Sequence, residues 1–289
     1  MSYLLHLVVF LEIYVVVAAS LNLLIGYAGL LQIAHAAYYG VGAYAGTFLM
    51  MKLGLGFLPS ALLGGLTAAV LSLLVSLPAW RFRGDAFVLM SLSVQVALFA
   101  AFYNWVDLTG GPFGISNIPK PTIVDSVFAT RGAVAAIYGV IVALCVGLLA
   151  LLTRSPFGRS LQAVRDDELA ARSLGIPARR LKVEAFAVAS ALVGVAGAMY
   201  AAYASYIDPT SFSLDESILM LSMVIVGGTG NVRGPFVGAL TLITIPELLR
   251  FAALPDAVAA GVRSLAYGLL LVVLMRFRPQ GLAGRYRFE

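Results

Sequence analysis

The residues best suited to chemistry are few in this chain and far apart in its sequence. The one cysteine is Cys145, and the two histidines are His6 and His35. A lone cysteine forms no internal disulfide, and two distant histidines do not have metal-ligand spacing. Three aspartates fall in predicted loops: Asp85, Asp107 and Asp125. With no triad or carboxylate pair in an apolar segment, the sequence predicts no catalytic residue, no metal site and no cofactor bound by this chain.

Composition places the chain in a membrane. Its 289 residues are 61% hydrophobic and 11% charged, with a mean hydropathy of +0.96. A soluble fold of this size could not bury so much apolar surface. The phosphate-binding motif G-x-x-x-x-G-K-[ST] does not occur in the sequence. We therefore do not expect this chain to bind a nucleotide itself.

Apolar runs of helical length predict an all-α, polytopic bundle of transmembrane helices. About 20 apolar residues are needed to cross the hydrocarbon layer as a helix. The runs near that length are 3–25, 30–51, 58–79, 86–105, 132–153, 183–206, 215–231, 235–252 and 258–276. They predict nine spans, within a range of eight to ten. The stretch from residue 26 to residue 46, which overlaps the second run, contains five glycines, and the seventh run is short. Either run could therefore be a broken or re-entrant segment.

Positive charge predicts how the chain is oriented. Most of the 19 lysines and arginines fall on the same side of the bundle as residues 158–182 when the runs are followed in order. Cations gather on the cytoplasmic side of membrane proteins. We therefore expect a cytoplasmic C-terminus, an external N-terminus, a cytoplasmic loop at 154–182 and an ordered, turn-rich external loop at 106–131.

Polar side chains within the runs are candidates for lining a path through the membrane, because polar groups are costly in hydrocarbon. The strongest candidates are Asn22, Gln32, His35, Tyr38, Tyr39, Ser91 and Gln95, with Ser93 and Asn104 beside them. A hydrogen bond between helices explains each of these residues at least as well as a contact with a substrate. The glycines of the runs are interpreted as packing positions: Gly40, Gly42, Gly46, Gly194 and Gly197.

The segment GRSLQAVRDDELAARSLGIPARRLK, residues 158–182, is the most highly charged part of the chain. Its pattern predicts one or two short helices across the membrane face, with Asp166, Asp167 or Glu168 as the N-cap of a second helix and Gly175 as a C-cap. One half of the helical wheel is apolar, formed by Leu161, Val164, Ala171 and Leu174. The segment could still be a solvated connector whose cations only set the topology.

Four blocks of the chain resemble one family. GRSLQAVRDDELAARSLGI resembles the cytoplasmic coupling loop of permease subunits of branched-chain amino-acid ABC importers. LNLLIGYAGLLQIAHAAYYGVGAYAG resembles the family's N-terminal signature, SFSLDESILMLSMVIVGGTGNVRGPFVGAL its glycine-turn region, and LLVVLMRFRPQGLAG its C-terminal end. The blocks follow the family's order. The DDE-containing loop and the RFRPQGL ending resemble the M-type of the two permease types.

This resemblance implies a division of labour between several chains. Residues 1–289 would form a single transmembrane permease domain in a prokaryotic inner membrane, beside a second permease chain, two ATP-binding subunits and an external solute-binding protein. ATP and Mg would be bound by the ATPase subunits. The coupling loop would dock on one of them. Its apolar residues would pack there or on the membrane-side base of this chain, and its charged residues would fix the register by pairing. The residues assigned to the loop are Gly158, Leu161, Arg165, Asp166, Asp167, Glu168, Ala171 and Gly175.

The resemblance also implies a substrate class. Leucine, isoleucine and valine are the expected cargo, and urea or short amides are the alternative because relatives of this family also move them. The second permease could be a homologue or another copy of this chain. A secondary transporter or channel fits the hydropathy alone, and an intramembrane enzyme is a further alternative without a catalytic constellation to support it.

Overall fold

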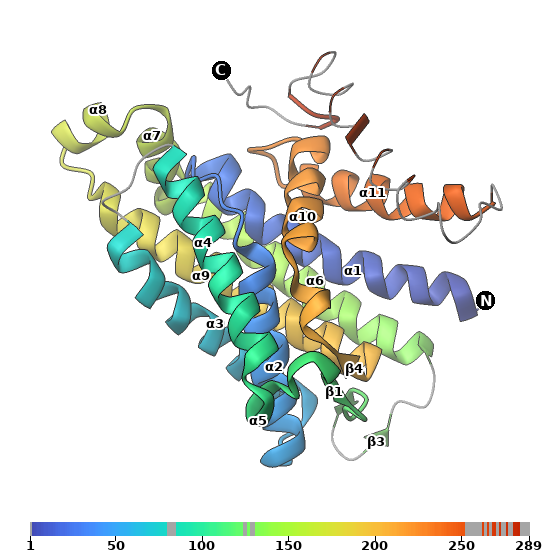
Figure 1. The fold of residues 1–289 in the computed structure, drawn as a ribbon. Helices are drawn as coiled ribbons and strands as arrows, with labels where there is room; N and C mark the ends of the chain where they lie inside the picture. The colour runs from blue at the N-terminus through green and yellow to red at the C-terminus, as the bar shows by residue number, and fades with distance from the viewer. Residues whose placement is uncertain are drawn as a thin grey trace.

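The computed structural model describes residues 2–79, 85–123, 126–127 and 131–251, and then residues 262, 265, 268–269, 272, 276 and 280–283. These residues form a helical bundle with a few two-residue strands (Figure 1). The predicted all-α class is therefore confirmed.

The long helices follow the apolar runs. They are α1 (Ser2–Asn22), α2 (His35–Lys52), α3 (Phe57–Ala79), α4 (Asp85–Asn104), α6 (Arg131–Arg154), α9 (Ala178–Ala204), α10 (Leu214–Gly227) and α11 (Gly234–Phe251). Among the described residues, five segments are long and apolar enough to cross a membrane: Tyr3–Tyr27, Phe57–Leu74, Ala86–Asn104, Gly132–Arg154 and Ala178–Ala204. The run at 258–276 lies mostly outside the described residues. The count of nine spans thus stays a prediction.

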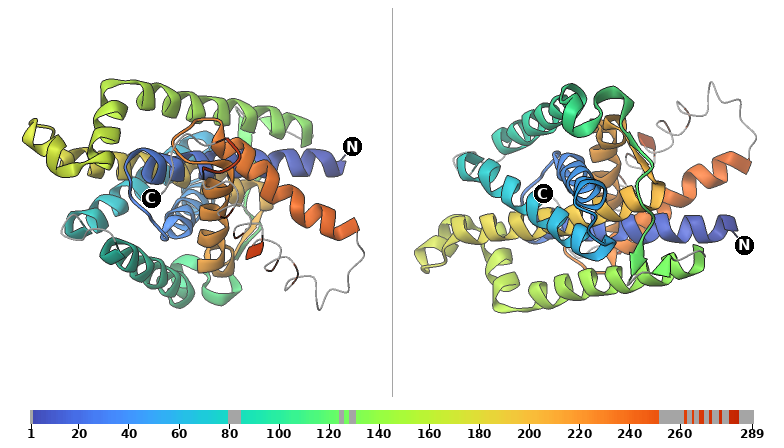
Figure 2. Two further views of the ribbon diagram at one scale, coloured as in Figure 1. Left: turned by 90° about the horizontal axis from the view of Figure 1, so that it is seen from above. Right: turned by 90° about the horizontal axis from the view of Figure 1, so that it is seen from below.

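Two helices form the centre of the bundle. The apolar windows of α1 and α9 are each 72% buried, whereas those of α4 and α6 are 22% and 33% buried. α9 packs against α1, α2 and α3. Figure 2 shows α4 and α6 on opposite outer sides of this centre. The peripheral helices therefore present apolar surface outward, as membrane helices do.

Glycines let α2, α3 and α9 approach closely. A Cβ atom at Gly42 of α2 would collide with the backbone of Gly194 in α9, and one at Gly194 would lie 2.9 Å from the Cα atom of Gly65 in α3. Small residues at helix contacts allow this spacing in membranes. The prediction that the glycines of the runs are packing positions is confirmed here.

The first two long helices are separated by a break. α1 continues into a π-helical turn, η1 (Leu23–Tyr27), and residues 28–34 are not helical before α2 begins at His35. The second run, expected to begin near residue 30, is helical only from His35, so the break that was considered for this run lies at its start. Apolar Leu30, Leu31 and Ile33 keep the hydropathy high through the break, whereas Gly29 has a φ of +67°. A positive φ ends helices and favours glycine.

Short elements join the predicted external loop to the connection between α9 and α10 at one end of the bundle. The segment 106–131 contains α5 (Val106–Thr109), a 3-10 turn η2 (Gly111–Phe113), β1 (Ile115–Ser116), β2 (Thr122–Ile123) and β3 (Ser126–Val127); β4 (Tyr206–Ile207) and η3 (Pro209–Phe212) lie between α9 and α10. β1 pairs antiparallel with β4, with Ile115 opposite Ile207, and β2 pairs with β3. We call this the β1–β4 end. The expectation of an ordered loop is confirmed for its described residues.

Candidate functional site

The charged segment folds into two short helices at the other end of the bundle. These are α7 (Pro156–Asp166) and α8 (Glu168–Ser173), between α6 and α9. This confirms the predicted pair of helices. Leu161, Val164 and Ala171 are buried within this chain at 0%, 2% and 3% exposure, whereas Leu174 is 81% exposed. The single apolar face predicted for all four was wrong for Leu174, because α8 starts on a new axis at Asp167 and ends before Leu174.

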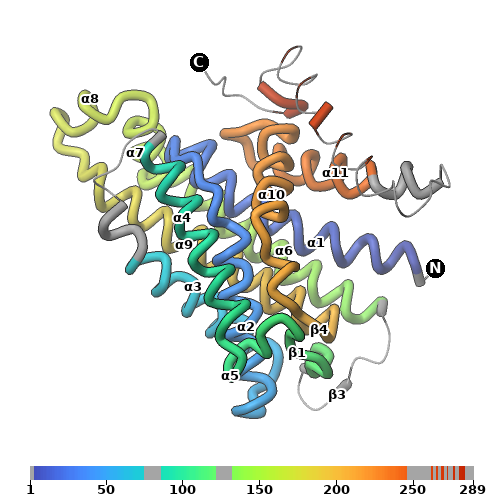
Figure 3. The backbone as a smooth tube through the Cα atoms, viewed as in Figure 1, coloured from blue at the N-terminus to red at the C-terminus, as the bar shows by residue number. Residues whose placement is uncertain are grey.

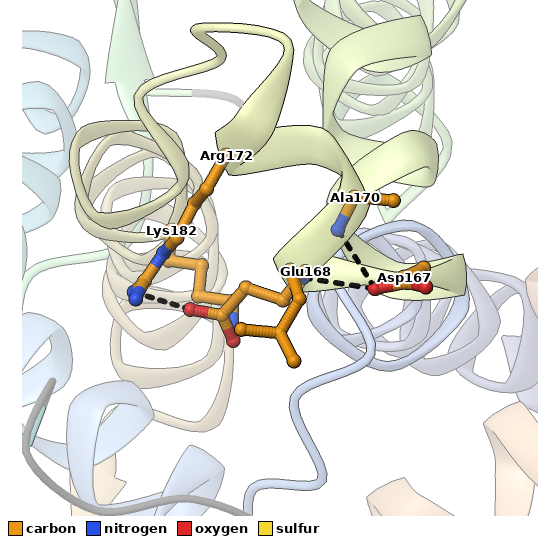
Figure 4. Close-up of polar contacts among 6 residues, drawn as sticks. Asp167, Glu168, Ala170, Arg172 and Lys182 are labelled. Atoms are coloured by element: carbon orange, nitrogen blue, oxygen red, sulfur yellow. Dashed lines mark hydrogen bonds and ion pairs between the residues drawn. The ribbon is translucent and has the colours of Figure 1, made fainter.

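Both ends of α8 obey local capping rules. Asp167 Oδ1 accepts hydrogen bonds from the N–H groups of Leu169 and Ala170, at 2.9 and 3.0 Å (Figure 4). At the other end Gly175, with a φ of +81°, donates to the Arg172 carbonyl, and Ile176 donates to the Ala171 carbonyl. This pair of bonds is the Schellman motif. The predicted N-cap and C-cap are confirmed.

The charges of this segment pair mostly with one another. Glu168 forms ion pairs with Arg172 and with Lys182, the latter at 2.9 Å, and Figure 4 shows both side chains reaching the same carboxylate. Arg165 Nη2 lies 2.7 Å from Asp166 Oδ1. Glu168 thus ties α8 to the first turns of α9. These charges give the loop a defined shape before any partner binds.

Arg165 connects α7 to the break after α1. Its Nη1 donates a hydrogen bond to the carbonyl of Gly26 in η1. A Cβ atom at Gly29 would lie 2.7 Å from the Cγ atom of Arg165, so the arginine stem lies directly on the non-helical segment. Figure 3 shows the backbone of α7 at the same end of the bundle as this segment. The side chain is only 11% exposed. A movement of α7 would therefore act on the break through this contact.

Asn22 extends the connection to the glycine turn between α10 and α11. Its Oδ1 accepts from the Gly230 N–H at 3.1 Å, and its Nδ2 donates to the Asn231 carbonyl at 3.0 Å. Asn231 Nδ2 in turn donates to the Ala283 carbonyl at 2.8 Å. Residues from all four family-like blocks are thus brought together. We call this the α7 end: η1, residues 28–34, α7, α8, residues 228–233 and residues 280–283.

Two path candidates cap α2. The Ile33 N–H donates to Ser91 Oγ at 3.1 Å, and the Ala37 N–H donates to Gln95 Oε1 at 3.0 Å. Ser217 of α10 accepts from the Ala36 N–H and donates to the same Gln95 oxygen. The first N–H groups of a helix lack internal partners, and α4 and α10 supply them here. Gln95 and Ser91 therefore have structural roles, and a contact with substrate stays a prediction.

The other candidates lie in the interior. His35 Nε2 is 3.0 Å from Ser20 Oγ, and Tyr38 and Tyr39 pack edge-on against Phe186 and Phe212. Some buried polar atoms have no hydrogen-bond partner among the described residues: both amide atoms of Gln32, His35 Nδ1 and the Tyr38 and Tyr39 hydroxyls. Such atoms usually find partners in a folded protein. Of the path candidates, Gln32 is thus the best remaining one.

Sequence reasoning missed several residues at these sites. Ser217 and Asn231 were not singled out, nor was the contact of Arg165 with Gly26. Tyr14 of α1, which donates to Glu216 of α10 at 2.6 Å, was also missed. Asn231 lies in the motif GGTGNVRGP, which was a usable signal. The contacts of Ser217, Arg165 and Tyr14 join residues more than 100 positions apart, so no local pattern in the sequence indicates them.

Comparison with known proteins shows that one family model covers most of the chain. The family model described as branched-chain amino acid transport system / permease component matches residues 3–275. The chain belongs to this family. The relatives are transport permeases, and with its apolar helices the chain is a multi-pass membrane protein. Three of the blocks that meet at the α7 end lie within the matched residues, and the fourth, residues 270–284, overlaps their end.

The individual relatives distinguish the two permease types. The chain is 34% identical to the high-affinity branched-chain amino acid transport system permease protein LivM of Escherichia coli, covering 93% of this chain and 67% of the relative. It is 27% identical to a probable LivM of Methanocaldococcus jannaschii (93% and 90%), and 24% identical to E. coli LivH (96% and 92%). The M-type resemblance is confirmed. No solved structure matches the chain.

Proposed function

We propose that this chain is the M-type permease of an ATP-driven importer that moves leucine, isoleucine and valine across a prokaryotic inner membrane. The observation that carries the proposal is the family match over residues 3–275, together with relatives whose names specify branched-chain amino acids. LivM and LivH are separate permease proteins in E. coli. A second permease chain, homologous or identical, completes the path.

ATP hydrolysis is assigned to other subunits. The chain has no G-x-x-x-x-G-K-[ST] motif, so ATP and Mg belong to two ATPase subunits that bind from the cytoplasm. An external solute-binding protein delivers the amino acid. Copurification of the tagged chain tests this assembly: transport by the chain reconstituted without any ATP-binding subunit would contradict it.

In this proposal the coupling loop, residues 154–182, transmits closure of the ATPase subunits. Leu169 and Leu174 are 69% and 81% exposed on the outer surface of the loop, which suits them to an apolar groove on a partner. Arg165 passes the movement to the break after α1. The loop thus acts as a lever between α6 and α9.

The variant Leu169→Ser with Leu174→Ser tests the docking surface. ATPase subunits should be lost on purification or their hydrolysis should become independent of substrate, while the permease stays folded. Leu53→Ser, an exposed leucine on the α2–α3 connection, is the control. A doubly substituted complex that assembles and transports at the wild-type rate would mean that the loop is only a solvated connector.

The orientation of the chain is tested by single cysteines on a Cys145→Ser background. Position 172 in the coupling loop should be protected from an impermeant thiol reagent added outside, and position 113 in η2 should react. Phe113 is 85% exposed, which makes it a sensitive external site. Labelling of position 172 from outside would overturn the assignment.

Substrate choice is tested by uptake into proteoliposomes that contain the whole importer. Radiolabelled leucine should enter in an ATP-dependent manner, and unlabelled isoleucine and valine should compete with it. Urea is the main alternative cargo. Uptake of urea without uptake of leucine would refute the amino-acid assignment while leaving the family and the assembly intact.

A further inference from the structure

A basic cavity of about 570 Å³ lies between α6, α7 and the glycine turn. Three arginines from different elements line it: Arg154 ends α6, Arg165 lies on α7, and Arg233 precedes α11. Gln162 and Asn231 add amide groups. None of the described lining residues is an aspartate or glutamate. The cavity therefore offers donors and positive charge to an anion.

The described part of the chain balances the positive charge of the cavity only in part. Arg165 pairs with Asp166 and donates to the Gly26 carbonyl. Arg154 and Arg233 form no ion pair with another described residue. α11 begins at Gly234, so the positive end of an 18-residue helix points at the same region. Guanidinium groups in this setting suit a phosphate, because its oxygens accept hydrogen bonds from several of their N–H groups at once.

The surface beside the cavity is apolar. Leu144, Leu148 and Leu151 of α6 are 68%, 46% and 71% exposed, and their spacing places them along one face of the helix. This face leads to Arg154, three residues after Leu151. An amphiphile with its head at Arg154 could lay its chains along these leucines. A free phosphate would leave the leucines uncovered.

We propose that this cavity binds the phosphate of an anionic phospholipid, held chiefly by Arg154 and Arg233, with the acyl chains along the Leu144–Leu151 face of α6. Basic pockets between helices on the cytoplasmic side suit such headgroups. The lipid would bridge the end of α6 and the turn before α11 directly above Arg165. Its phosphate would steady α7 against the break that Arg165 contacts.

The test measures lipid binding rather than transport, so it does not depend on the substrate assignment. The complex that contains the full chain is purified in a neutral detergent, depleted of lipid and titrated with phosphatidylglycerol, phosphatidylcholine or inorganic phosphate. Native mass spectrometry counts bound lipid, and thermal unfolding reports stabilisation. Variants are Arg154→Gln with Arg233→Gln, each single substitution, and Arg180→Gln as the control. Arg180 pairs with Glu184 at the start of α9, so its loss lowers the net charge by one outside the cavity, as each single substitution does within it.

Wild type and Arg180→Gln should bind phosphatidylglycerol about tenfold more tightly than phosphatidylcholine, and the double variant should lose about tenfold in affinity. The affinities of the single variants for phosphatidylglycerol should lie between those of wild type and the double variant. The single variants therefore keep the test valid if the double variant folds poorly. Unchanged phosphatidylglycerol binding in the folded variants would overturn the proposal. Equal binding of the two lipids would overturn it as well. Stabilisation by inorganic phosphate that matches stabilisation by phosphatidylglycerol would reject the lipid in favour of the free anion.

Discussion

The two ends of the bundle differ in how far they depend on side-chain hydrogen bonds. At the β1–β4 end, the loops before α6 and after α9 are joined by backbone pairing, with Ile115 opposite Ile207 and the Ile118 N–H bonded to the Ser205 carbonyl. At the α7 end, backbone bonds tie Leu282 and Ala283 to the end of α10. Side chains make the other bridges there: Arg165 reaches Gly26, and Asn22 reaches the glycine turn. Single substitutions remove side-chain bonds but leave backbone pairs in place. The α7 end should therefore be far more sensitive to substitution.

The largest effect is expected from Asn22→Ala. Asn22 is 3% exposed, and its loss leaves the Gly230 N–H and the Asn231 carbonyl without these partners, at a cost of about 2 kcal/mol in the free energy of unfolding. Leucine uptake should fall about tenfold. Thermal unfolding and uptake in proteoliposomes measure both effects. Asn104→Ala is the control, because among the described residues the Asn104 side chain bonds only the Ala100 carbonyl, within α4 near the other end. Equal losses in the two variants would contradict the comparison.

Gly175→Val should uncouple ATP hydrolysis from transport. Valine is strained at the φ of +81° that the α8 C-cap requires, so α8 should be displaced and transport should fall several-fold while hydrolysis continues. Gly54→Val is a matched control: Gly54 also has a positive φ, +64°, and open space around it, but it lies between α2 and α3. If both variants transport alike, the loop has no special role.

Asp167→Ala should have a smaller effect. It removes the cap of α8, a change of about 1 kcal/mol, and leaves the ion pairs of Glu168 in place. We expect roughly a twofold to fivefold loss of transport per ATP hydrolysed. Asp167→Ser keeps a capping oxygen and should restore most of the activity. Failure of serine to restore it would assign the effect to the lost charge instead.

The smallest effect is expected from Tyr206→Phe at the β1–β4 end. The hydroxyl donates a 3.2 Å bond to the Phe113 carbonyl, and Tyr206 is 44% exposed. Its loss should change the free energy of unfolding by less than about 0.5 kcal/mol, because the β1–β4 backbone pairs remain. Uptake should stay at the wild-type level. A large loss here would mean that side chains also hold this end together.

Local rules predicted local structure at the site. Asp167 and Gly175 were identified because capping depends on neighbours a few residues away. Leu174 was placed wrongly because a helical wheel assumes one axis, and the chain changes axis at Asp167. The start of α2 was also missed, because hydropathy does not register a break made of apolar residues. Gln95 and Arg165 act on backbone groups of other elements, which no local pattern reveals.

The close contact of Gly42 with Gly194 also limits how the protein can move. Where these helices touch backbone to backbone, no side chain lies between them that could rearrange during sliding. α2, α3 and α9 should accordingly behave as one rigid body. Deformation must then concentrate in the non-helical residues 28–34 and in the junction of α6 with α7 at Ser155, whose extended ψ of 173° interrupts the helical path. Arg165 of α7 contacts the chain beside the first hinge, and α7 itself begins at the second. A rotation of α7 would therefore bend both hinges at once.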